Sequence, residues 1–85
     1  MNWYKTTEEK FKLLIDKMPI FLRGTASAQV SKKAQNLAEA ANRQEITEQD
    51  MVNAFFAQTP FGFQGLMKND LIDVGIDYTK YGHAK

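Results

Sequence analysis

The sequence has no cysteine, a single histidine and only two prolines among its 85 residues. Without cysteine the chain contributes no disulfide, no Cys-ligated zinc site, no iron–sulfur cluster and no thiol nucleophile. The one histidine, His83, lies near the C-terminus and gives no basis for a His-based triad or an imidazole metal site. We therefore expect no catalytic residue, no metal site and no cofactor in this chain, and the prediction is that it is not an enzyme.

Long apolar runs are also absent. No stretch of about 18 apolar residues occurs, so no membrane-spanning helix and no membrane partner are expected. The first five residues lack a basic region followed by an apolar one, so they do not predict a signal peptide. A cytoplasmic location is the resulting expectation. At this length the chain has room for one domain, 1–85, with a thin core.

Charge is nearly balanced overall but divided unevenly along the chain. Residues 1–43 hold eight Lys and Arg against four acids, and residues 44–85 hold three Lys against six acids. A basic first half could face an anionic ligand or a nucleic acid. The alternative, which we favour because like charges form no block, is that the two halves pack together and neutralise one another.

Hydrophobic periodicity predicts an all-α bundle of about four helices with short connections. In the first helix, Thr6 and Glu9 have the spacing of a capping box. One apolar stripe then follows at helical spacing, formed by Phe11, Leu14, Ile15 and Met18. Pro19 is expected to end this helix, because the residue before a proline is disfavoured in the α region.

Residues 18–24, Met-Pro-Ile-Phe-Leu-Arg-Gly, form the most distinctive stretch. We expect a short helical turn, opened by Pro19 and closed by Gly24, whose apolar side chains are buried. Arg23 would then either bind a carboxylate or donate hydrogen bonds to carbonyl groups at the end of the first helix. We prefer the second interpretation. A second helix over about 26–42, capped by Ser27, should follow and end at Asn42 in the left-handed conformation.

The second half predicts two further helices. Thr47 and Asp50 form a capping box for the third, and a fourth over about 63–74 should stop at Gly75. One more turn is expected at 77–81, and the last three residues should fray. Among the aromatic residues, Phe61 lies in a turn and is the candidate for an exposed binding side chain.

Three segments together resemble a known module: Met18–Arg23, the small-residue stretch Val30–Ala38, and Glu45–Glu48. They are similar to the PCP-red domain at the C-terminus of the B subunit of light-independent protochlorophyllide reductase. That family shows an I-P-x-F-V-R segment and an I-T-x-E cap, which here read M-P-I-F-L-R and E-I-T-E-Q-D. The resemblance covers about residues 8–57, and a helical C-terminal extension, 58–82, goes beyond it.

The resemblance implies a function without catalysis in this chain. The parent enzyme reduces a ring double bond of a chlorophyll precursor with an iron–sulfur cluster and a nitrogenase-like partner, and the module carries neither. Its implied roles are to cover a tetrapyrrole or to dock on another protein, as an accessory domain of a multi-subunit oxidoreductase. Pro19, Phe21 and Arg23 carry over from the first motif, whereas Ile46 and Thr47 carry over as structural positions. Asn42 departs from the small residue that often ends the family's middle helix.

Two alternatives remain open. A nucleic acid could bind Arg23, Lys32, Lys33 and Arg43, although a pI of about 8.0 disfavours such a partner. A protein partner or a second copy of the chain could instead bind the 58–76 segment, where Phe61 and Phe63 lie.

Overall fold

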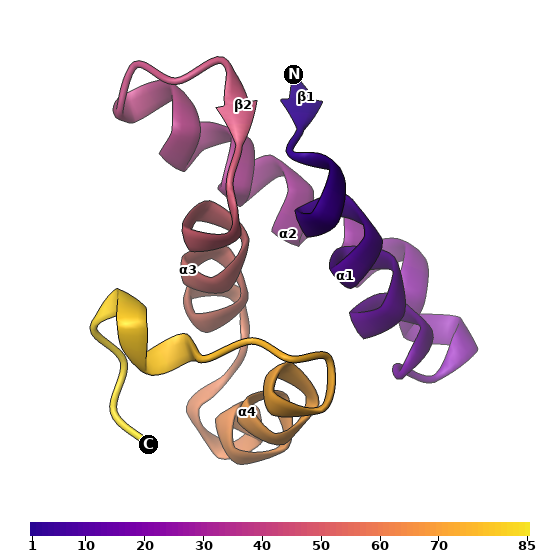
Figure 1. Ribbon diagram of the computed structural model, residues 1–85. Helices are drawn as coiled ribbons and strands as arrows, with labels where there is room; N and C mark the ends of the chain where they lie inside the picture. The colour runs from indigo at the N-terminus through magenta and orange to yellow at the C-terminus, as the bar shows by residue number, and fades with distance from the viewer.

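The computed structural model describes residues 1–85 and is predominantly helical (Figure 1). The elements in chain order are β1 (Asn2–Trp3), α1 (Lys5–Asp16), α2 (Ile20–Ala40), β2 (Glu45–Ile46), α3 (Glu48–Gln58), the 3-10 helix η1 (Phe61–Phe63), α4 (Gln64–Asp73) and the 3-10 helix η2 (Tyr78–Tyr81). The predicted all-α class with four helices and short connections is confirmed. No helix is both long and apolar enough to cross a membrane.

The core lies where α1, α2 and α3 meet, and α4 and η2 close it from below in Figure 1. Phe55 of α3 packs against Phe11 of α1, with ring centroids 6.0 Å apart. α2 packs most extensively against α3, and its buried residues are Val30, Ala34 and Ala38, whose small side chains suit close contact. The alanine-rich stripe of α2 therefore lies in the core.

The start of α1 differs from the prediction. The helix begins at Lys5 with Tyr4 as its N-cap and without a side-chain cap, so Thr6 and Glu9 lie within the helix and form no capping box. The reason is tertiary: β1 pairs in parallel with β2, and the Tyr4 amide donates to the Ile46 carbonyl at 2.9 Å. The chain passes directly from this pairing into the helix, two residues earlier than expected. The two-residue strands β1 and β2 themselves were not expected from the sequence.

The prediction of a short turn followed by a separate helix at 26–42 is wrong. α2 is one continuous helix of 21 residues that begins after Pro19, so Gly24 does not close a turn and Ser27 is not a cap. Proline is tolerated where a helix starts, because the amide groups of the first turn have no acceptor within the helix. A single glycine inside the helix lowers its stability by only about 1 kcal/mol. Ile20 and Phe21 are 80% and 82% exposed, so the expected burial of this segment is also wrong.

The remaining helix boundaries agree with the predictions. Thr47 and Asp50 form the capping box of α3. Asn42 has φ 59°, and Gly75, with φ 83°, ends α4 where the Ile76 amide donates to the Leu71 carbonyl at 2.9 Å. These ends depend on side-chain caps and left-handed residues, which are local features that a sequence shows directly.

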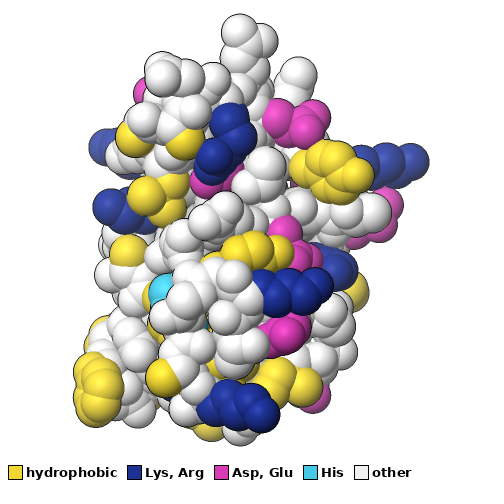
Figure 2. Space-filling model, turned by 60° about the vertical axis from the view of Figure 1, so that its left-hand side comes forward, with side chains coloured by type: hydrophobic (Ala, Val, Ile, Leu, Met, Phe, Trp, Pro, Cys, Tyr) yellow, Lys and Arg dark blue, Asp and Glu magenta, His cyan; other side chains and the backbone are white.

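The two halves of the chain neutralise each other, as favoured above. Three ion pairs each join a base from residues 1–43 to an acid from residues 44–85: Lys10–Glu48 at 3.1 Å, Lys17–Asp73 at 3.5 Å, and Arg43–Asp50. Figure 2 shows Lys and Arg side chains lying beside Asp and Glu side chains on one face. Three of the eight Lys and Arg side chains of the first half are thus paired with acids of the second half.

Candidate protein-docking surface

Arg23 fixes the start of α2 against the end of α1. Its Nε donates to the Met18 carbonyl at 2.9 Å, and its Nη2 donates to the Asp16 carbonyl at 2.7 Å. Asp16 is the last residue of α1 and Met18 lies in the connection to α2, so neither carbonyl has a partner within a helix. The preferred interpretation of Arg23 is therefore confirmed, and the guanidinium is occupied by the backbone rather than by a carboxylate.

This anchoring presents three apolar side chains to solvent. Ile20, Phe21 and Leu22 follow the exposed Pro19 at the first turn of α2, and we call these three residues the α2 apolar tip. No aromatic ring packs against Phe21. Because Pro19 and Arg23 hold the backbone of the turn, the apolar side chains are displayed on a rigid support. A rigid support lowers the entropy lost when a partner binds.

Phe61, the fourth predicted binding residue, lies on a different element. It begins η1, between α3 and α4, and is 90% exposed, which confirms that this turn residue is exposed. Phe63 is 61% exposed in the same turn, and no ring packs against Phe61. The structure therefore brings Pro19, Phe21 and Arg23 together in one turn and places Phe61 in a second, separate apolar area.

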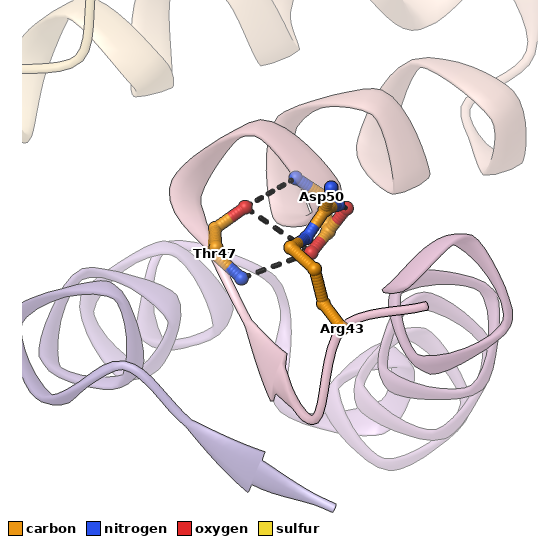
Figure 3. Close-up of polar contacts among 3 residues, drawn as sticks. All are labelled: Arg43, Thr47 and Asp50. Carbon is orange, nitrogen blue, oxygen red and sulfur yellow. Dashed lines mark hydrogen bonds and ion pairs between the residues drawn. The ribbon is translucent and has the colours of Figure 1, made fainter. Parts of the chain in front are cut away.

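Arg43 is held at the other end of α2. Its Nη2 forms an ion pair with Asp50 Oδ1, and Asp50 Oδ2 accepts from the Thr47 amide at 3.0 Å (Figure 3). The Arg43 Nε is buried and has no hydrogen-bond partner. Of the four basic residues predicted as nucleic-acid contacts, Arg23 and Arg43 thus already bind groups within the fold. Lys32 and Lys33 remain outside any ion pair.

A polar hollow of about 530 Å³ lies between the start of α1, the start of α3 and η2. At its edge Glu48 accepts from the Tyr81 hydroxyl at 2.5 Å and from Lys10 at 3.1 Å. Partial burial would raise the pKa of Glu48, but the hydrogen bonds from Tyr81 and Lys10 outweigh it and hold the pKa below its usual value. Burial and the Glu48 contact raise the pKa of Tyr81 to about 12. Sequence reasoning missed this cluster, whose members are 33 or more positions apart.

His83 packs on the core instead of fraying. Its ring stacks on Phe56 with centroids 3.7 Å apart, and its Nε2 lies 2.6 Å from Asn53 Oδ1. In Figure 2 only part of the histidine is visible between its neighbours. Burial and the nearby Lys68 charge lower the pKa of His83. No local pattern in the sequence predicts this contact, because nothing near Phe56 indicates which face of α3 the C-terminal residues cover.

The larger surface hollows are all lined mainly by polar side chains. The three most exposed large apolar residues line none of these hollows: Ile20 and Phe21 of the α2 apolar tip, and Phe61 of η1. Such a surface suits contact with a complementary protein better than enclosure of a flat organic ring.

Comparison with known proteins identifies no relative: no family model, no curated protein and no solved structure matches the chain. The resemblance to the PCP-red domain therefore rests on the motif residues named above.

Proposed function

We propose that this chain is a small non-catalytic helical interaction domain that docks on another protein through the α2 apolar tip. The observation that carries the proposal is the exposure of Ile20 and Phe21, 80% and 82%, on a turn that Arg23 holds in place. Exposed aliphatic and aromatic side chains on a fixed backbone are typical of the anchors that bury into a partner.

The resemblance narrows the class of partner that we propose. Phe21 stands at the position shared with the PCP-red motif, as do Pro19 and Arg23, which support it. We propose that the partner is a subunit of a multi-subunit oxidoreductase of tetrapyrrole metabolism. Because the larger hollows are polar, the proposed link to a chlorophyll precursor runs through this protein partner rather than through direct binding of the pigment.

A crosslinking experiment tests the docking surface. A photoreactive phenylalanine analogue is placed at position 21 in one variant and at position 61 in another, and a crosslinked protein is identified and purified. The expected result is a crosslink from position 21, with Phe21→Ser weakening binding of the purified partner at least about tenfold. Phe61→Ser is the matched control, since it removes an equally exposed aromatic from a different element.

Other outcomes identify other functions. A crosslink confined to position 61, or a partner that binds Phe21→Ser as tightly as the wild type, contradicts the proposal and favours the 58–76 segment. Sedimentation that shows a stable dimer lost in Phe21→Ser identifies the partner as a second copy. Absorbance titration with protochlorophyllide is expected to show no shift at tens of micromolar, and a shift would establish direct pigment binding.

A further inference from the structure

Residues 17–38 contain no aspartate or glutamate, and the chain has one other acid-free interval of similar length, 51–69. Most of α2 lies in this interval, and its first acid is Glu39, which accepts from Gln35 at 2.9 Å. The exposed surface of α2 before that point therefore combines apolar, amide and lysine side chains without any negative charge.

Midway along this surface is a hollow of about 290 Å³. It is lined by Gln29, Lys32, Lys33 and Asn36 of α2 and by Gln58 at the end of α3. Every lining side chain carries an ammonium or an amide N–H₂ group, and none carries a carboxylate. Unlike Lys10 and Lys17, Lys32 and Lys33 are not in ion pairs. The hollow thus presents two uncompensated positive charges together with three amide donors, which is the chemistry that binds a carboxylate.

Phe21 and Leu22 of the α2 apolar tip lie on the same side of the helix as the hollow. Phe21 and Lys32 are eleven residues apart, close to three helical turns, so their side chains leave α2 in nearly the same direction. At 1.5 Å per residue the two positions are separated by about 16 Å along the helix axis. A single partner segment lying along α2 can therefore contact both.

We infer that the docking partner presents an acidic amphipathic helix, with apolar side chains over Phe21 and Leu22 and one or two carboxylates in the Lys32–Lys33 hollow. This inference rests on the proposed function and adds the chemistry of the partner. A nucleic acid fits less well, because Arg23 and Arg43 are engaged and two free lysines on this surface give few phosphate contacts. The α2 apolar tip would also have no apolar surface to contact on a phosphate backbone.

The test uses three probes on the intact chain. The first is a helical 20-residue peptide with a Leu pair and, eleven positions away, a Glu pair. The second has a Gln pair in place of the Glu pair, and the third is a 20-base-pair DNA duplex. Binding is followed by NMR shifts of the side-chain amides of Gln29, Asn36 and Gln58. The Glu peptide should bind about tenfold more tightly than the Gln peptide at low salt, because two exposed ion pairs contribute about that much binding free energy.

Paired variants make the result specific. Lys32→Gln with Lys33→Gln should remove the preference for the Glu peptide, while Lys5→Gln with Lys12→Gln, an equal loss of charge on α1, should preserve it. Equal binding of both peptides, lost in Phe21→Ser, overturns the acidic partner but leaves the docking function standing. Tighter binding of the duplex, lost in the Lys32 and Lys33 variant, replaces it with a nucleic-acid partner. Shifts from none of the probes also overturn the inference, and the crosslinking result then decides the docking function by itself.

Discussion

Asp50 makes more polar contacts than any other side chain of its helix, although it is only 2% exposed. One oxygen accepts from Arg43, and the other accepts from the Thr47 amide at 3.0 Å and the Thr47 hydroxyl at 3.1 Å. Burial of a carboxylate is costly unless such partners compensate it. Asp50 therefore joins the end of α2 to the start of α3, and its charge is tolerated because both oxygens are used.

We expect Asp50→Ala to lower the free energy of unfolding by about 2–3 kcal/mol, since it removes both the cap and a charged hydrogen bond. Thr47→Ala should cost only about 1 kcal/mol, because Asp50 keeps its contact with Arg43. Urea unfolding followed by circular dichroism measures both values. Equal losses from the two variants would show that the Arg43 contact contributes nothing.

His83 should make the stability of the C-terminal segment depend on pH. Burial and the Lys68 charge lower its pKa in the folded chain, so folding favours the neutral ring. Its contribution is complete above about pH 6.5, the usual value in an unfolded chain, and declines as the pH falls below it. The groups that act on the ring are Asn53 and Phe56 of α3 and the charge of Lys68 of α4.

His83→Phe is the matched control, because it keeps an aromatic ring on Phe56 and removes the titration. The wild type should lose more stability than this variant between pH 7.5 and 5.5, and the imidazole NMR signals, which come from a single histidine, should titrate below 6.5. A wild-type His83 that titrates above 6.5 would contradict the lowered pKa.

At the scale of elements, α2 and its neighbours show how helix boundaries are set. Pro19 starts α2 and Asn42 follows its end, and both are visible in the sequence. Gly24 is not a boundary, although a glycine after a short apolar run resembles one. Gly24 lies inside α2 because the helix already begins after Pro19, and one interior glycine costs only about 1 kcal/mol.

Replacing Gly24 with alanine tests this continuity. A Cβ added at Gly24 meets no atom within 4 Å, so Gly24→Ala should stabilise the chain by about 0.5–1 kcal/mol through helix propensity. Gly75→Ala should instead destabilise it by about 1 kcal/mol, since φ is +83° there. The change in urea midpoint measures both. A destabilising Gly24→Ala would indicate that a separate turn ends at Gly24.

At the scale of the whole molecule, the N-terminal residues close the structure. β1 pairs with β2 across 43 positions, and Trp3 stacks on Phe11 with centroids 4.6 Å apart. The Lys10–Glu48 and Lys17–Asp73 ion pairs join the same two halves along α1. The first half of the chain is thus bound to the second half by strand, aromatic and ionic contacts together.

Trp3→Ala should lower the free energy of unfolding by about 2 kcal/mol, because it removes a half-buried ring from the Phe11 contact. In the wild type, fluorescence of this single tryptophan and the helical circular dichroism should change at the same urea concentration. A fluorescence transition that precedes the loss of helix would show that the N-terminal segment opens independently of the core.

The sequence by itself determined the helical class, the caps at Thr47 and Gly75, and the exposure of Phe61, because periodicity, capping and turn residues act within a few positions. Only the tertiary structure decided that α1 begins at Lys5, that α2 is continuous, and that Glu48, Tyr81 and His83 have their present neighbours. It also decided that the 18–24 segment is exposed. Those outcomes depend on which distant surfaces meet, and in a thin-cored domain of 85 residues some apolar side chains are left without a place inside.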